Sequence, residues 1–286
     1  MGFSEIKTVS VIGAGWLGLP LIEKLLENGY QVKASTTTES KILKLRTMGV
    51  KAYNLNFSPT CADMDQLNDL LATDAVVICI PPRFRQHQLQ AYHAEQIKVI
   101  KDAIESLPVN KVIYTSSTGV YENSNTEINE NSPTSTSPKA KSILLAEEVL
   151  RINTDLDATI LRLGGLMGYD RIPAKYVNGK KNLNYGDIPV NYVFRDDVIR
   201  AIISILDIND HNSWNKVFNL VAPEHPPKRL VYSESVKYGN FTLPTFDDPN
   251  SPPPFKIINS DKIKSKIGFE FSFPNPLDFK YDTLVD

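Results

Sequence analysis

The chain has 286 residues, a formal net charge of −2, 42% hydrophobic residues and 22% charged residues, an ordinary balance for a globular protein. Without an excess of basic residues, the composition disfavours nucleic acid as a partner. Two cysteines in a chain of this length indicate a reducing compartment. The N-terminal pattern is not that of a signal peptide, and no run reaches the roughly 20 apolar residues of a membrane span. We therefore expect a cytoplasmic protein with no membrane partner.

Short apolar runs alternate with longer helical patterns along most of the chain. The expected strands are Thr8–Ile12, Gln31–Ser35, Lys51–Asn56, Ala75–Ile80, Lys111–Thr115, Ala158–Leu163 and Val217–Val221. The expected helices are Leu19–Asn28, Ile42–Met48, Gln66–Leu71, His87–Leu107, Ala140–Arg151 and Asp197–Leu206. This alternation is typical of βαβ units, so we predict an α/β fold with a Rossmann-like doubly wound parallel sheet.

The composition changes beyond the last expected strand. Residues 223–254 hold many of the prolines and lack a long apolar periodicity, which predicts a small, irregular C-terminal lobe. Residues 122–138 are rich in Asn, Ser, Thr and Pro and predict a surface loop. The resulting division is a Rossmann domain over residues 1–165, completed by about 187–222, and a lobe formed by residues 166–186 and 223–286.

A glycine-rich turn lies between the first expected strand and the first expected helix. Residues Gly13–Gly18 match G-x-G-x-x-G in the strand–turn–helix context that the fingerprint requires. Gly13 permits the tight turn, Gly15 lets a pyrophosphate approach the backbone, and Gly18 lets the helix pack closely. The phosphates would take free N–H groups at the positive end of the helix. We predict that Gly13, Gly15, Trp16, Leu17 and Gly18 bind a dinucleotide; a turn without a ligand is the alternative.

The end of the second expected strand bears on the choice between NAD and NADP. An Asp or Glu about 20 residues beyond the fingerprint usually holds the ribose 2′-hydroxyl of NAD. Here Ser35, Thr36 and Thr37 occupy that stretch, and the first carboxylate is Glu39. Hydroxyls can hydrogen-bond a 2′-phosphate, and a lysine can neutralise it; the candidates are Lys33, Lys41 and Lys44. We therefore predict NADP(H) over NAD(H), with solvated turn residues as the alternative.

Two further strand ends belong to the predicted ligand edge, because ligands of open α/β sheets bind beyond the carboxyl ends of strands. Ile80, Pro81 and Pro82 end the fourth strand and are predicted to bind the cofactor. Arg83 and Arg85 follow, either to meet an anionic group or to stay solvated. The fifth strand runs into the hydroxyl-rich segment Thr115–Tyr121, whose hydroxyls can bond a substrate carbonyl or the nicotinamide ribose. A Ser/Thr-rich turn that caps the strand is the alternative.

Several segments, taken in order, resemble motifs of the extended short-chain dehydrogenase/reductase superfamily, the NAD-dependent epimerase/dehydratase group. They span about residues 8–225 and comprise Gly13–Gly18, Thr115–Tyr121, Glu130–Pro133, Leu161–Gly168 and Val193–Val198. The Gly-Trp-Leu-Gly turn and Ile267–Phe271 look most like an atypical bacterial subgroup that is nucleoside-diphosphate-sugar epimerase-like. The resemblance implies a small-molecule substrate with a hydroxyl or carbonyl group, a nucleotide sugar among the options, and a monomer or homodimer.

The resemblance also places the superfamily's catalytic residues. Its Ser or Thr falls at Ser117, and Ser116 beside it would contact the cofactor. Its general acid/base is a Tyr whose pKa is lowered by a Lys four residues later, on a helix that also carries a Glu. Counting back from Glu147 puts Lys139 and Ile143 in those two positions, and counting from Glu148 gives Ala140 and Leu144. Neither register supplies the Tyr–Lys pair.

The missing pair leaves two functional interpretations. In the first, Ser117 with Thr118 or Tyr121 holds the substrate oxygen of an NADP(H)-dependent oxidoreductase or epimerase; Tyr121 is equally well explained as a ring packed under the following loop. In the second, the chain is a catalytically inactive NADP(H)-binding sensor. A Tyr-x-x-x-Lys does occur at Tyr176 and Lys180, but without the helical context. The histidines and cysteines share no metal-ligand spacing, so we predict no metal.

Overall fold

The computed structural model describes residues 5–58, 63–82, 91–152, 154–208, 214–247 and 250–283. The chain forms two compact units. Unit 1 comprises residues 1–120, 134–162 and 199–218, and unit 2 comprises residues 121–133, 163–198 and 219–286. Compared with the division expected from the sequence, residues 121–133, 163–165, 187–198 and 219–222 fall in unit 2 and not with the Rossmann domain.

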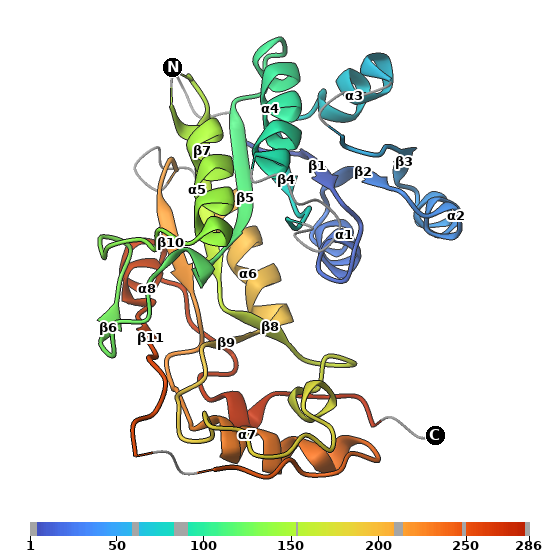
Figure 1. The fold of residues 1–286 in the computed structure, drawn as a ribbon. Coiled ribbons are helices and arrows are strands. Elements are labelled where there is room, and N and C mark those ends of the chain that lie inside the picture. The colour runs from blue at the N-terminus through green and yellow to red at the C-terminus, as the bar shows by residue number, and fades with distance from the viewer. Residues whose placement is uncertain are drawn as a thin grey trace. The chain divides into compact units, whose positions relative to one another are not determined.

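A seven-stranded sheet organises the fold, with the strand order β10-β7-β5-β4-β1-β2-β3 (Figure 1). The strands are β1 (Thr8–Ile12), β2 (Gln31–Thr36), β3 (Lys51–Asn54), β4 (Ala75–Ile78), β5 (Lys111–Ser117), β7 (Asp157–Leu163) and β10 (Val217–Leu220). The pairs of β1 with β2 and β4, of β2 with β3, and of β4 with β5 are all parallel. The chain starts in the middle of the sheet, so the strand order reverses beside β1 and β4, where open α/β sheets bind ligands. The predicted Rossmann-like fold is confirmed.

Helices cover both faces of the sheet in unit 1. They are α1 (Gly18–Glu27), α2 (Glu39–Thr47), α3 (Met64–Leu71), α4 (Tyr92–Glu105), α5 (Pro138–Arg151) and α6 (Arg195–Leu206), whose first residues belong to unit 2. Buried side chains of α3, α4 and α5 form one hydrophobic cluster with one face of the strands, and α1 lies on the opposite face (Figure 1). The four residues of β4 are fully buried, as the apolar run predicted for a central parallel strand.

Unit 2 contains more regular structure than the sequence predicted. Its elements are β6 (Glu127–Ile128) paired with β11 (Ile257–Ile258), β8 (Gly165–Met167) paired with β9 (Tyr192–Phe194), and the helices α7 (Lys228–Ser235) and α8 (Asp261–Ile267). The expectation of an irregular lobe was wrong here. Helices of eight and seven residues span about two turns, too few for an apolar periodicity to stand out among prolines.

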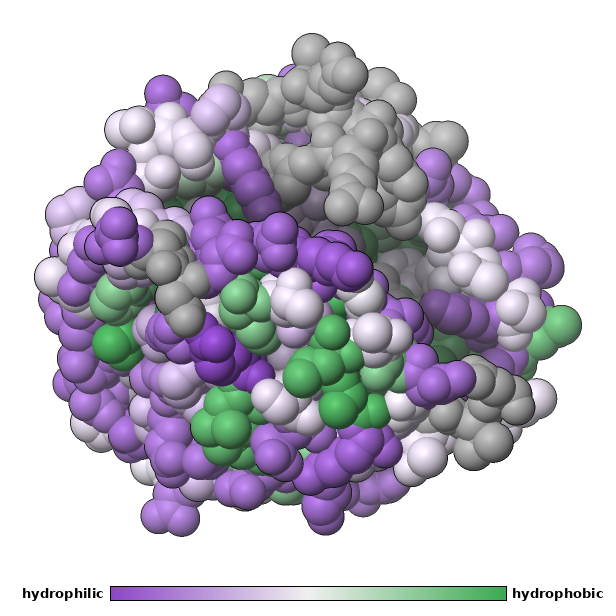
Figure 2. All heavy atoms as spheres, turned by 60° about the horizontal axis from the view of Figure 1, so that its bottom comes forward, coloured by the Kyte–Doolittle hydropathy of each residue, from purple (hydrophilic) through white to green (hydrophobic). Residues whose placement is uncertain are grey.

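The exposed large hydrophobic side chains are scattered over several elements: Leu43, Met64, Leu145, Ile152, Tyr176, Leu230 and Leu243. On the face shown in Figure 2, hydrophilic residues predominate and apolar residues lie in small separate groups. Single exposed hydrophobic residues are normal on a water-facing surface. Within the described ranges, no helix combines the length and the apolar composition that crossing a membrane requires.

Candidate functional site

The turn between β1 and α1 is fixed by the end of β2. The Gly13 N–H donates to Ser35 Oγ at 3.2 Å, and the Ala14 N–H donates to the Ser35 carbonyl at 2.8 Å. Gly13 has φ +97°, and a Cβ there would lie 3.0 Å from a methyl carbon of Ile80. Glycine is therefore required at this position, both by the backbone conformation and by the space available.

Helix α1 begins directly after this turn with its N-terminus open. Leu17, its N-cap residue, makes no side-chain cap, and the first turn carries no acidic residue. The N–H groups at this end therefore keep their positive partial charge available to an anion. Gly18 lies under the turn, because a Cβ there would come within 2.1 Å of the Gly13 carbonyl oxygen. Gly15 is exposed, and a Cβ there would meet nothing closer than 4.0 Å.

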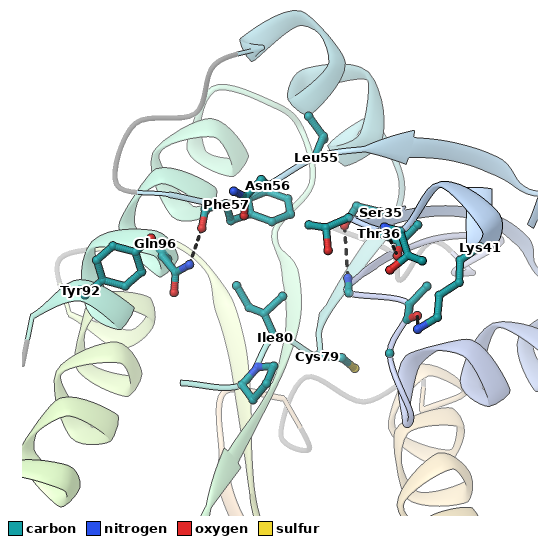
Figure 3. Close-up of a pocket in the computed structure, with 16 residues that line it drawn as sticks. Ser35, Thr36, Lys41, Leu55, Asn56, Phe57, Cys79, Ile80, Tyr92 and Gln96 are labelled. Carbon is teal, nitrogen blue, oxygen red and sulfur yellow. Dashed lines mark hydrogen bonds between the residues drawn. The ribbon is translucent and has the colours of Figure 1, made fainter. Parts of the chain in front are cut away.

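A cleft of about 290 Å³ opens at the carboxyl ends of β1, β2, β3 and β4, and we call it the strand-end cleft (Figure 3). It is lined by Gly13, Ala14, Gly15, Ser35, Thr36, Thr37, Thr38, Lys41, Leu55, Asn56, Phe57, Cys79, Ile80, Pro81, Tyr92 and Gln96. All of these residues belong to unit 1. The cleft thus lies where the strand order predicts a ligand.

Seven residues predicted to bind the cofactor line this cleft: Gly13, Gly15, Ser35, Thr36, Thr37, Ile80 and Pro81. Five others do not line it: Trp16, Leu17, Gly18, Pro82 and Ser116. Leu17 is 8% exposed and packs in the core, and the Ser116 hydroxyl donates to Glu147. Arg83 and Arg85 lie outside the described residues.

Sequence reasoning missed part of the cleft wall. The missed residues are Ala14, Thr38, Leu55, Asn56, Phe57, Cys79, Tyr92 and Gln96. The rule that ligands bind beyond strand ends would have found Leu55–Phe57, because they follow β3 directly. Tyr92 and Gln96 come from α4, and no motif marks them. Burial raises the pKa of the Cys79 thiol to about 12, so it stays protonated at neutral pH.

Of the three candidate lysines near β2, Lys41 is the one that lines the cleft. Its Nζ donates to the Ala14 carbonyl at 3.2 Å, at the glycine-rich turn. Lys33 donates instead to the carbonyl of Ala72 at 3.1 Å and pairs with Asp69 at 3.2 Å. Lys44 pairs with Glu23 at 2.9 Å.

The corner between β5 and α5 holds a buried ion pair beneath the predicted catalytic hydroxyls. Arg162 Nε lies 3.0 Å and 3.2 Å from the two carboxylate oxygens of Glu147, and its Nη2 lies 2.7 Å from Glu147 Oε2. Ser116 completes this group. Ser117 is half-buried, and its Oγ accepts the Gly119 N–H at 3.0 Å. Its hydroxyl hydrogen therefore remains able to donate. Thr118 is buried at the start of the short 3₁₀ turn Thr118–Val120.

The Tyr–Lys pair is missing from α5 in three dimensions as well. Ile143, in the position of the Lys, is 2% exposed and packs near Gly119, while Lys139, in the position of the Tyr, is exposed. Tyr176 ends a 3₁₀ turn (Pro173–Tyr176) and is 53% exposed, and Lys180 lies in the loop beyond it. These two residues share no helix.

Tyr121 lies in unit 2 and is 2% exposed. Its hydroxyl donates to Asn219 Oδ1 at 2.8 Å, and Asn219 is itself fully buried. The Asn219 backbone N–H donates to Glu130 Oε1 at 2.8 Å, so this part of the lobe is held by a satisfied polar network. The position of Tyr121 matches the alternative interpretation of a ring packed inside the fold. Within the described residues, no three His, Cys, Asp or Glu side chains are grouped to hold a metal ion.

Comparison with known proteins identifies the family. A family model described as NAD(P)H-binding matches residues 13–209, which is more than half of the chain. The chain belongs to this NAD(P)H-binding family. Protein YeeZ of Escherichia coli strain K12 is 32% identical over 276 residues, which cover 95% of this chain and 98% of that protein. NAD(P) binding, predicted from the glycine-rich turn, is therefore confirmed at the level of the family.

Solved structures agree on the fold of this NAD(P)H-binding protein. A short-chain dehydrogenase/reductase superfamily protein from Agrobacterium tumefaciens with bound NAD is 16% identical, with a TM-score of 0.75 and 94% of each chain covered. UDP-glucose 4-epimerase from Thermotoga maritima with UDP-glucose is 18% identical, with a TM-score of 0.75 and 94% and 96% of the two chains covered. The fold that the resemblance to the extended short-chain dehydrogenase/reductase superfamily implied is confirmed.

Proposed function

We propose that the chain binds NADP(H) in the strand-end cleft and acts as an oxidoreductase or epimerase-type enzyme on a hydroxyl- or carbonyl-bearing substrate. One observation carries the choice of cofactor. Lys41 and the hydroxyl-bearing residues Ser35 to Thr38 line the cleft at the end of β2, where an NAD-binding protein usually presents a carboxylate. The first carboxylate after this stretch of the sequence, Glu39, accepts a hydrogen bond from Asn54 and does not line the cleft.

The cleft assigns a role to each part of its wall. The open end of α1 would hold the diphosphate, and the exposed Gly15 would leave room for it beside the turn. The ammonium group of Lys41 keeps donors beyond the one it gives to Ala14, so it can pair with a 2′-phosphate. Ser117 does not line the cleft. Its hydroxyl oxygen already accepts the Gly119 N–H, and the hydroxyl would donate to a substrate carbonyl. The cofactor would supply or accept the hydride.

Calorimetric titration of the full chain with NADPH and NADH tests the cofactor assignment. We expect NADPH to bind at least ~10-fold more tightly, because a charge-assisted hydrogen bond contributes about 1.5–3 kcal/mol. Lys41→Ala should remove most of this preference and leave NADH binding nearly unchanged. Lys44→Ala is the matched control, since Lys44 pairs with Glu23 and does not line the cleft. Equal affinities for the two nucleotides in the unmodified chain would refute the NADP(H) assignment.

A second function is favoured by the contents of α5. Ile143 and Lys139 stand where the related enzymes carry their proton-transferring pair, and this supports an NADP(H)-binding sensor without turnover. Decay of NADPH absorbance with carbonyl and sugar-nucleotide substrates distinguishes the two functions. UDP-glucose belongs in the panel because a structural relative was solved with it. Turnover that is lost in Ser117→Ala supports the enzyme, whereas tight NADPH binding with no turnover supports the sensor.

A further inference from the structure

A chain of hydrogen bonds runs from the wall of the strand-end cleft into the core of unit 1. Gln96, on α4, lines the cleft, and its Nε2 donates to the Phe57 carbonyl (Figure 3). Gln96 Oε1 lies 3.2 Å from Nδ1 of His93, one turn earlier on α4. The other ring nitrogen of His93 lies 2.7 Å from the Tyr114 hydroxyl on β5. His93 is 3% exposed and Tyr114 is fully buried, so the bond between these two residues is shielded from water.

The Phe57 carbonyl sets the direction of every bond in this chain. A carbonyl oxygen only accepts, so the amide nitrogen of Gln96 must face it and the amide oxygen must face His93. His93 Nδ1 therefore carries the proton, and Nε2 accepts from the Tyr114 hydroxyl. Burial lowers the pKa of His93 and raises that of Tyr114, which favours the neutral ring and the protonated phenol. If the Gln96 amide were rotated by half a turn, its oxygen would face the Phe57 carbonyl oxygen and its N–H would face the protonated Nδ1 of His93. Two acceptors would then oppose each other at Phe57 and two donors at His93, which costs free energy.

The part of the cleft beside Gln96 suits a flat heteroaromatic ring. The rings of Phe57 and Tyr92 and the side chain of Ile80 lie around it (Figure 3), and Pro81 also lines the cleft. With a diphosphate at the glycine turn and a ribose at the end of β2, the base attached to that ribose reaches the ends of β3 and β4. The Gln96 amide keeps one N–H and one oxygen lone pair beyond its bonds to Phe57 and His93.

We propose that His93, as a positioning residue, acts with the Phe57 carbonyl to hold the Gln96 amide in one orientation, and that this fixed amide selects a base edge with an exocyclic amine beside a ring-nitrogen acceptor. An adenine edge has this pattern, and side-chain amides recognise it through paired donor and acceptor groups. A hypoxanthine edge reverses it, with a keto oxygen beside a ring N–H. A free amide can turn to match either edge, whereas a fixed one matches only the first. The inference rests on the proposed binding of a dinucleotide in this cleft.

Calorimetric titration with NADPH and with its hypoxanthine analogue tests the proposal. For the unmodified full chain, we expect NADPH to bind about 10-fold more tightly, the cost of one mismatched buried polar group. The double variant His93→Phe/Tyr114→Phe keeps an aromatic ring at both positions and removes both polar partners together, which limits the loss of stability. We expect the affinity ratio to fall but to stay above unity, because the amide then loses the constraint from His93 while the Phe57 carbonyl still disfavours turning it. Tyr114→Phe alone is the control, and it should keep the ratio because His93 still holds Gln96.

Three results would overturn the role of His93: an unmodified chain that binds both nucleotides equally, a double variant that keeps the full ratio, or a control that loses as much as the double variant. A purely structural role would weaken both ligands together and leave the ratio unchanged. Should the double variant not fold, Gln96→Leu tests the selection by the amide, since the ratio must then approach unity, and Gln96→Leu with the full ratio would overturn the proposal. An unmodified chain that binds neither nucleotide would instead refute the proposed function itself, and the inference with it.

Discussion

Two glycine-rich segments look alike in the sequence and serve different needs in the structure. Residues 164–168 in unit 2 contain three glycines, and each lies against other parts of the same unit. A Cβ at Gly164 would come within 2.6 Å of the Asn191 carbonyl oxygen, and one at Gly165 within 2.7 Å of the Tyr192 ring. In this segment, glycine is present because residues 191–194 pack directly on the backbone.

In the glycine-rich turn of unit 1, one glycine is required by close packing and another faces open space. Gly18 is crowded by the Gly13 carbonyl, but Gly15 faces open space at the strand-end cleft. The fold itself does not require glycine at position 15. A glycine that nothing in the chain explains, at the edge of a cleft, indicates room that is kept for a ligand. Substituting one glycine at a time tests this contrast between the two segments.

Gly18→Ala should have the largest effect. Its new methyl group would overlap the Gly13 carbonyl oxygen at 2.1 Å, and backbone cannot move aside as a flexible side chain can. We expect a loss of ~3 kcal/mol or more in the free energy of unfolding, measured by urea denaturation followed by circular dichroism. Gly29→Ala is the control: Gly29 has φ +84° but no atom within 4 Å of a Cβ, so conformational strain of about 1 kcal/mol is all that remains. Equal losses in the two variants would contradict the packing argument.

Gly164→Ala should come next, with a loss of about 2 kcal/mol, because the Asn191 carbonyl that it meets is backbone and its neighbours must shift. Gly165→Ala meets the ring of Tyr192 instead, which can rotate or tilt. The same denaturation measurement should therefore rank Gly165→Ala below Gly164→Ala. The reverse order would show that the Tyr192 ring is held more rigidly than the backbone of Asn191.

Gly15→Ala should separate binding from folding. We expect the free energy of unfolding to change by less than about 0.5 kcal/mol, as for a surface substitution. NADPH affinity should fall about 10-fold or more, because the methyl group would occupy the space through which a pyrophosphate approaches the backbone. Calorimetry and denaturation of the same sample measure both quantities. A variant that binds NADPH normally would remove the argument that the open space at Gly15 serves a ligand.

Much of the fold was predictable because it depends on local patterns. The expected strand Thr8–Ile12 is reproduced, and α5 begins at Pro138, close to the expected Ala140. The expected start of the helix His87–Leu107 lies outside the described residues. The strand-end cleft was predictable in part, since G-x-G-x-x-G and the strand ends mark the backbone that forms it. The side chains that complete the wall of the cleft were not predictable. Gln96 and Tyr92 reach the cleft from a helix whose remaining surface looks like any amphipathic helix.

The hydroxyl of Tyr121 shows a second limit. The sequence places it four residues after Ser117, which made it a candidate to hold a substrate oxygen. Its partner, Asn219, is 98 residues away in the chain, and only the tertiary structure shows that the hydroxyl donates to it. A polar side chain is available for chemistry only if the fold has not already used it. Spacing along the sequence does not report this.

Lys33 and Lys41 show the same contrast as Gly18 and Gly15. The side chain of Lys33 is engaged in contacts within the fold, whereas Lys41 lines the strand-end cleft. Asp69 on α3 accepts from Lys33, Lys51 and Tyr53, and these contacts, led by that of Lys51, lower its pKa to about 2 from the ordinary 3.8. A carboxylate with a depressed pKa stabilises the folded state above 3.8, and this contribution is lost as the pH falls through about 2.

Asp69→Asn should therefore flatten the fall in thermal stability between pH 4 and pH 2. The difference will be small because the carboxylate is 44% exposed and screened by water. NADPH affinity at neutral pH should not change, since Lys33 is held outside the strand-end cleft by the Ala72 carbonyl as well. A marked gain in NADPH affinity would mean that the released Lys33 reaches the 2′-phosphate. In that case the Asp69 carboxylate alone would decide whether Lys33 is bound within the fold or available to the cofactor.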